Sequence, residues 1–227
     1  MRNCFVSLCL AAAVGSAGAV QLVLSPSNVI GASGSYGANF QADNILDQQT
    51  GTATDVSGNY WLNPDNTGAA SVFITVDLGA AYTLEFIQLF NTHNGPWVDR
   101  GTGNFTILGA NAVTDLGGGN FRVSGTTATL VSGTLSALYG GDPPAVTFDV
   151  TDTGAYRYLS FQPTSVASAI TPPSSTAYGL NEMRVFITAV PEPATWMTWL
   201  AGLAALGGWA LRRAPRPGSP ASGAVSA

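Results

Sequence analysis

Hydrophobic and polar residues alternate along the middle of the chain, which is the pattern of strands with one buried face. The period of two runs clearly through residues 72–78, 146–150 and 183–187. Residues 82–90 are nearly all apolar and predict a central strand, and residues 105–108 and 156–161 predict two more. Clusters of Gly, Asn, Asp, Ser and Thr separate these segments, as turns require. The pattern therefore predicts an all-β domain, a β-sandwich or jelly roll.

The N-terminal 19 residues have a different pattern from the strands. Arg2 precedes a short apolar run over residues 4–14, and small residues follow, with Ala17 and Ala19 at the spacing that signal peptidase requires. The run is too short to span a bilayer, which takes about 20 apolar residues. We therefore predict a signal peptide over residues 1–19, cleaved after Ala19. Both cysteines lie inside it, so the mature chain has no disulfide, no cysteine nucleophile and no cysteine metal ligand.

The C-terminal region begins with a short motif, continues with an apolar run over residues 194–211 and closes with two arginines. Its motif residues are Val190, Pro191, Glu192, Pro193, Arg212 and Arg213. The apolar run would span about 27 Å as a helix, close to the thickness of a hydrocarbon core, and the arginines suit the cytoplasmic side. This predicts one C-terminal hydrophobic helix. Residues 214–227 are rich in Pro, Ser, Gly and Ala and predict a disordered tail.

This order of elements resembles the PEP-CTERM sorting signal of Gram-negative bacteria. The resemblance implies that an exosortase-type enzyme in the inner membrane recognises and processes residues 190–213. The protein would be anchored in that membrane transiently and then reach the cell surface or the extracellular matrix. The alternative is a plain C-terminal anchor, which keeps the orientation but not the processing.

Residues 20–189 have the length of one domain. They hold 12 acidic residues, four arginines and no lysine, a formal charge of −8. Nucleic-acid binding needs Lys and Arg to neutralise phosphates, so this charge argues against a nucleic-acid partner. It argues equally against binding to anionic lipid, and it permits cations.

Several segments of this domain, taken in order, resemble a discoidin domain, also called the coagulation-factor C-type domain. They are Ala42–Asp47, Asn59–Trp61, Ile74–Gly79, Ile87–Leu89, Tyr156–Phe161 and Gly179–Val185. The resemblance covers about residues 25–188 and implies the galactose-binding-like jelly-roll fold, with Tyr60 and Trp61 in the core. Residues 109–141 depart from it, because they are Gly- and Thr-rich and longer than the family's usual connection.

The same resemblance implies a structural calcium ion that joins the first loop to the last strand. The matching positions are Asp47, the loop from Thr50 to Thr52, and Glu182. Calcium takes six to eight oxygen ligands, which carboxylates, carbonyls and hydroxyls can supply. The alternative is that Asp47 caps a turn and that Glu182 is a solvated residue at the start of a strand.

A loop after the predicted central strand carries the residue types of a sugar-binding site: His93, Asn94, Trp97 and Arg100. An aromatic face suits the apolar side of a sugar ring, and fixed donors and acceptors suit its hydroxyls. The alternative is that Trp97 packs on the end of the barrel and that Arg100 pairs with Asp99 or another carboxylate.

We therefore expect an exported cell-surface or extracellular-matrix protein whose domain binds carbohydrate, with a polysaccharide as partner. A structural surface protein that makes protein contacts is the alternative, and a hydrolase comes last. The sequence has no Gly-x-Ser-x-Gly motif and only one histidine. Nothing in it selects a pair of carboxylates for glycoside cleavage, so we predict that the protein is not an enzyme.

Overall fold

The structure is a computed structural model that describes residues 18–51, 59–64, 72–92, 97–168, 170, 173 and 177–188. The chain divides into two compact units, Met1–Ala189 and Val190–Ala227. The second unit lies wholly outside the described residues, and so does the predicted signal peptide apart from Gly18 and Ala19. Within the part of the chain that is described, no helix is long and apolar enough to cross a membrane.

The described residues form twelve strands and two short 3-10 helices, so the all-β prediction is confirmed. The helices are η1 (Pro26–Asn28) and η2 (Ala42–Leu46). The strands are β1 (Val20–Leu22), β2 (Val29–Ala32), β3 (Trp61–Leu62), β4 (Ile74–Phe90), β5 (Gly101–Thr102), β6 (Asn104–Asp115), β7 (Phe121–Thr134), β8 (Ala145–Asp149), β9 (Ala155–Pro163), β10 (Val166–Ala167), β11 (Gly179–Leu180) and β12 (Glu182–Ile187).

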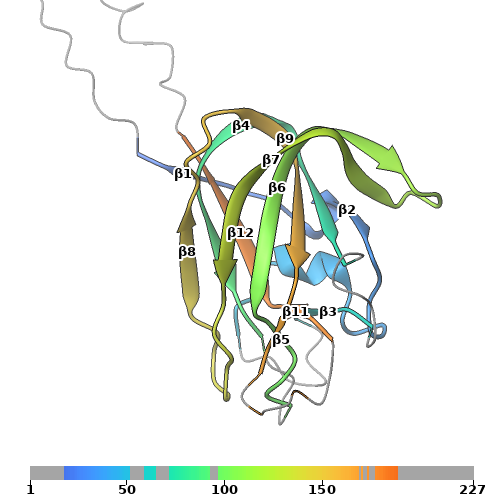
Figure 1. Cartoon of the computed structure of the whole chain (residues 1–227), viewed down its shortest axis with the longest axis vertical. Coiled ribbons are helices and arrows are strands. Elements are labelled where there is room, and N and C mark those ends of the chain that lie inside the picture. The colour runs from blue at the N-terminus through green and yellow to red at the C-terminus, as the bar shows by residue number, and fades with distance from the viewer. Residues whose placement is uncertain are drawn as a thin grey trace, which may run out of the picture. The chain divides into compact units, whose positions relative to one another are not determined.

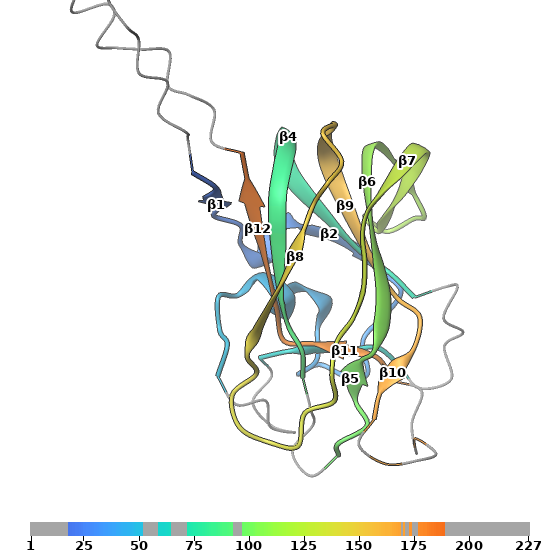
Figure 2. The ribbon, with the colours of Figure 1, turned by 60° about the vertical axis from the view of Figure 1, so that its left-hand side comes forward.

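Two antiparallel layers share the long strand β4 (Figures 1 and 2). The first half of β4 pairs with β2 on one side and with β9 on the other, and β9 continues to β6 and β7. The second half pairs with β12 and β8, and β12 continues to β1. The result is a jelly-roll β-sandwich. Short ribbons β3–β11 and β5–β10 close one end of it.

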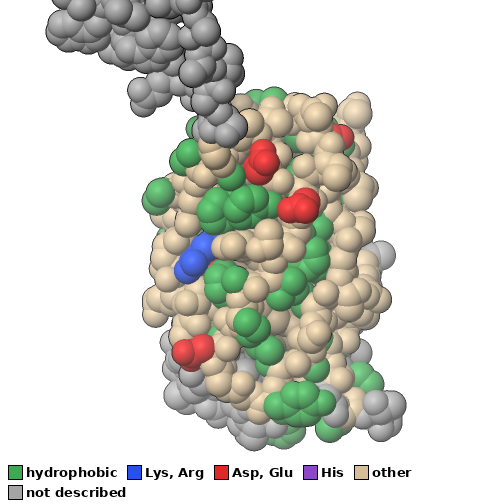
Figure 3. Space-filling model, turned by 90° about the vertical axis from the view of Figure 1, so that its left-hand side faces the viewer, with side chains coloured by type: hydrophobic (Ala, Val, Ile, Leu, Met, Phe, Trp, Pro, Cys, Tyr) green, Lys and Arg blue, Asp and Glu red, His purple; other side chains and the backbone are tan. Residues whose placement is uncertain are grey.

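The bend in β4 joins two strands that the sequence pattern separates. Gly79 takes a positive φ of 83°, which favours glycine, and the register with β9 shifts between Asp77 and Tyr82. The second half is central, as predicted, but only one of its faces is buried. On the other face Phe86 stacks on Phe186 of β12, with ring centroids 4.2 Å apart. Figure 3 shows the side of the molecule where β8 lies, with hydrophobic side chains scattered among polar ones.

Residues 109–134 belong to a long hairpin rather than a connection, and residues 135–141 follow it. β6 and β7 pair from Asn104↔Thr134 to Asp115↔Phe121. The turn is made by Gly117, Gly118 and Gly119, all with positive φ, and the strands on either side contain many β-branched residues. The glycines and threonines that set this stretch apart in the sequence are therefore its turn and its strands.

The core lies between the two layers and includes Trp61, which is fully buried with Tyr60, as the family resemblance implied. The Trp61 indole donates a hydrogen bond to the Gly34 carbonyl at 3.0 Å and packs edge-on against Phe161. Trp61 therefore fixes the loop after β2 to the core, because its one polar atom finds a partner in that loop.

Candidate functional site

The loop after β4 starts at Asn91, whose side chain is hydrogen-bonded to Thr102 and Ser136; we call these three residues the Asn91 base. The side chain of Asn91 is buried, and its Nδ2 donates to the Thr102 carbonyl at 2.9 Å and to the Ser136 carbonyl at 2.8 Å. Its Oδ1 accepts from the Thr102 amide at 2.9 Å. A Cβ on Gly179 would lie 2.5 Å from the Arg100 carbonyl, so these backbones touch. One amide thus joins three segments at the same end of the sandwich.

Trp97 is exposed on this base. Its relative exposure is 51%, and the guanidinium carbon of Arg100 lies 5.4 Å from the centroid of its ring. Arg100 is itself mostly buried, and its Nε lies 3.7 Å from the Oδ1 of Asp99, a carboxylate buried to 1% exposure. Part of the indole therefore faces solvent while a fixed cation supports the ring.

The loop was predicted either to bind sugar or to have only a structural role. Trp97 agrees with the first interpretation and Arg100 with the second. Trp97 is half exposed, so packing against the barrel end does not account for it. Arg100 pairs with Asp99, as the structural alternative expected. His93 and Asn94 lie outside the described residues.

Two further exposed hydrophobic residues follow segments at the same end of the sandwich as Trp97, and the sequence pattern did not indicate them. Tyr139 is 78% exposed and follows Ser136, which is tied to Asn91. Ile170 is 44% exposed and follows β10, which pairs with β5. Neither belongs to a recognisable motif, and only the pairing of distant segments brings their loops to the same end as Trp97.

The first loop and the last strand meet at Glu182. Its side chain is fully buried, and its Oε2 accepts a hydrogen bond from the Gln48 amide at 3.2 Å. Gln48 adopts a positive φ of 65°, unusual for a residue other than glycine. Glu182 Oε1 has no hydrogen-bond partner among the described residues, and Arg184 Nε is 3.9 Å away. Glu182 is therefore not a solvated residue at the start of a strand, as the alternative to a calcium ligand required.

Burial and, after it, the negative charge of Asp47 raise the pKa of Glu182 to about 8, while Arg184 and the hydrogen bond from the Gln48 amide act in the opposite direction. The pKa of Asp47 is also raised, first by burial and then by Asp43, although the Gln49 amide partly offsets this. A cation would relieve this arrangement, in which one carboxylate disfavours the ionisation of a second, buried carboxyl group.

The described residues fit part of a calcium site. Asp47 and Glu182 supply two carboxylates, and Thr50 is half-buried in the loop that follows Asp47. Thr52 lies outside the described residues. No group of three or more His, Cys, Asp and Glu side chains gathers in the described part of the chain. The remaining ligands would therefore have to be backbone carbonyls or hydroxyls, which calcium accepts.

Comparison with known proteins identifies the C-terminal segment and the fold. Residues 189–214 match the PEP-CTERM protein-sorting motif. No curated protein matches the sequence. The structure is similar to CBM32-3 of a family 31 glycoside hydrolase from Clostridium perfringens, with a TM-score of 0.50, 17% identity, and coverage of 74% of this chain and 96% of that one.

Two further solved structures are similar. One is the family 32 carbohydrate-binding module of C. perfringens NanJ in complex with galactose (TM-score 0.48, 13% identity, 74% of this chain and 99% of that chain). The other is a chitosan-binding module of a chitosanase/glucanase from Paenibacillus sp. (0.46, 20%, 73% and 98%). The predicted sorting motif and jelly-roll fold are thus confirmed, the fold by the CBM32-3 similarity.

Proposed function

We propose that this protein is an exported, non-catalytic surface or matrix protein whose β-sandwich binds carbohydrate through the loops around Trp97. The single observation that carries the proposal is the half-exposed indole, supported by Arg100 on a base that Asn91 holds rigid. An aromatic face held in place loses little conformational freedom on binding, so it suits the apolar face of a sugar ring. His93 and Asn94 would supply hydrogen bonds to the sugar hydroxyls.

A glycan array with the purified protein tests this function. Trp97→Ala should weaken binding to a glycan held by these loops at least tenfold, because removal of a central aromatic anchor costs about 2 kcal/mol or more and a factor of ten is about 1.4 kcal/mol. Val23→Ala is the control, since Val23 is 84% exposed and follows β1, which does not contribute to these loops. Equal glycan binding by wild type and Trp97→Ala would place the sugar away from these loops, and the absence of any glycan ligand would favour the structural alternative, in which this end contacts proteins.

We further propose that a calcium ion joins Asp47, the loop Thr50–Thr52 and Glu182. The buried Oε1 of Glu182, which accepts no hydrogen bond from the described residues, and the raised pKa of both carboxyl groups support it. The ion would supply positive charge and link the first loop to β12 in a chain whose mature part has no cysteine. The residues of this chain would hold it, and its role would be structural.

Delivery is proposed from the matched motif at residues 189–214. An exosortase-type enzyme would process the segment that begins with Val190–Pro193 and contains Arg212 and Arg213. The protein would be held in the inner membrane before release to the surface or the extracellular matrix. The acidic, lysine-free domain gives no support to a nucleic-acid partner.

A further inference from the structure

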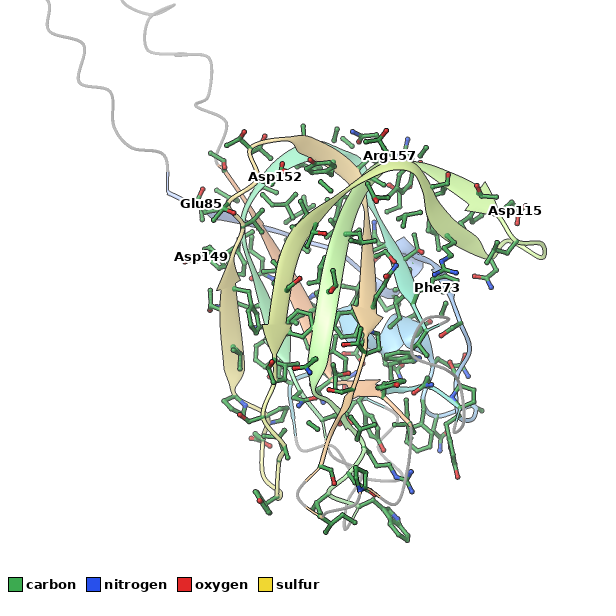
Figure 4. All side chains as sticks on the ribbon, in the orientation of Figure 1. Phe73, Glu85, Asp115, Asp149, Asp152 and Arg157 are labelled. Carbon is green, nitrogen blue, oxygen red and sulfur yellow. The ribbon has the colours of Figure 1, made fainter. Side chains whose placement is uncertain are left out.

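A groove of about 790 Å³ lies between the N-terminal part of the domain and the turn of the β6–β7 hairpin. Strand β2 contributes its floor, η1 and the start of η2 form one side, and residues 118–120 form the other. Figure 1 shows the hairpin reaching over β2, and Figure 4 places Asp115 on that hairpin, close to its turn. The volume of the groove falls within the range of about 300 to 1,000 Å³ that is typical of ligand sites.

The hairpin is fixed in place above β2. The Asn120 side chain accepts a hydrogen bond from the Ala32 amide at 2.9 Å and donates one to the Ala32 carbonyl at 3.1 Å. A Cβ on Gly31 would lie 1.9 Å from the Phe121 carbonyl oxygen, so only glycine permits this approach of the two backbones. The turn itself is closed by the Leu116 and Asn120 amides and by Asp115. The wall of the groove is therefore held in place by hydrogen bonds and by close backbone packing against β2.

The groove wall carries neutral hydrogen-bonding groups. Gly118 and Gly119 line it, and their amides have no hydrogen-bond partner among the described residues. Ser27 and Ser35 add hydroxyls. Among the described residues that line the groove, Asp43 is the one ionisable side chain, and none is Lys or Arg. These groups can donate hydrogen bonds to hydroxyl groups and accept hydrogen bonds from them. The described lining has no cationic side chain that could neutralise an anion.

A peptide strand is the less suitable occupant. Strand addition needs a free edge, and the outer edge of the four-residue β2 is already occupied where Asn120 takes both main-chain groups of Ala32. The groove also offers mainly small residues rather than pockets for alternate side chains. A polyhydroxylated chain needs neither feature.

We propose that this groove is a second glycan site, separate from the loops around Trp97, and that it takes neutral or amine-bearing sugar chains and rejects acidic ones. Serine hydroxyls and the free glycine amides bind the sugar hydroxyls, and Asp43 pairs with an amine where one is present. The groove depends on the hairpin turn and η1, whereas the first site depends on the Asn91 base, so either can fail alone.

The test is amide NMR of the isotope-labelled protein titrated with four hexasaccharides: maltohexaose, mannohexaose, a chitosan hexamer and hexagalacturonate. The chitosan hexamer and at least one neutral hexamer should shift the amides of Gly31, Gly118 and Gly119. Ser27→Trp should weaken this binding at least tenfold by filling the groove, whereas Thr127→Trp on the exposed part of β7 should not. Asp43→Asn should remove the preference for the chitosan hexamer and leave neutral binding intact.

Three results would overturn the proposal. One is the absence of groove shifts with every neutral and amine-bearing hexamer, and another is an equal response to hexagalacturonate. The third is a shift of the same amides with protein concentration alone, which would mean that a second copy occupies the groove. Trp97→Ala separates this site from the first, because it should leave the groove shifts unchanged whether or not the Trp97 loops bind sugar.

Discussion

Glu182→Gln tests the electrostatics of the buried carboxyl group directly. The side chain begins β12 opposite Phe90, and it is inaccessible to solvent. Its pKa is about 8 in the folded protein and 4.5 in the reference state without burial, with desolvation as the main cause and Asp47 as the second. Glutamine keeps the shape and removes the ionisation.

The direction of the pH effect follows from proton binding. Between pH 4.5 and about 8 the folded chain keeps the Glu182 proton while the unfolded chain has released it. The stabilising contribution is therefore complete below pH 4.5 and is lost as the pH rises to about 8. The two pKa values differ by an amount worth at most about 5 kcal/mol. For a domain of this size, 1 kcal/mol moves the melting temperature by about 2–4 °C, so the loss amounts to at most roughly 10–20 °C.

Calcium should reverse this trend, because the ion favours the ionised carboxylate. The assay is thermal unfolding of wild type and Glu182→Gln from pH 4.5 to 8.5, each in chelator and in calcium. In chelator the melting temperature of the wild type should fall by roughly 10–20 °C more than that of the variant over this range. In calcium the wild type should recover that loss and the variant should not. Calorimetry in two buffers of different ionisation enthalpy should show proton release on calcium binding at pH 7.

Parallel pH profiles of wild type and Glu182→Gln in chelator would refute the argument from burial. A melting temperature that rises with calcium but without proton release would place the ion away from Glu182. Misfolding of the variant would be recognised in the same experiment, because a misfolded variant would lack a cooperative melting transition.

Three further predictions follow from the same structure and sequence. Asp47→Ala should abolish the rise in melting temperature on adding calcium, whereas Asp115→Ala on the hairpin should keep it. In the wild type, calcium at 100 times its dissociation constant should stabilise the fold by about 2.7 kcal/mol. Equal responses of the two variants would exclude Asp47 as a ligand. Replacement of Pro191–Pro193 by alanines should leave export across the inner membrane intact and block surface delivery, as fractionation would show; unchanged delivery would favour a plain anchor. N-terminal sequencing of the exported protein should begin at Val20, and recovery of residues 1–19 would contradict cleavage after Ala19.

The sequence alone determined features that depend on neighbouring residues. Alternation placed strands at residues 146–150 and 183–187, where β8 and β12 occur, because the side-chain period of a strand is local. The sorting motif at residues 189–214 is a linear signal and needed no structure. The order of the discoidin-like segments predicted the burial of Trp61, and its complete burial agrees.

Only the tertiary structure decided how these segments meet. Glu182 is buried where β12 pairs with Phe90 of β4 and the first loop reaches it through the Gln48 amide, and no local pattern distinguishes it from a solvated strand residue. Asn120 bonds to Ala32 across 88 residues, and from that contact come the fixed hairpin and the groove beside it. Asn91 likewise bonds to Ser136 across 45 residues, and this contact brings the segment before Tyr139 to the end of the sandwich where Trp97 lies. Such contacts are set by strand pairing between distant parts of the chain, since the register of one segment depends on the position of another.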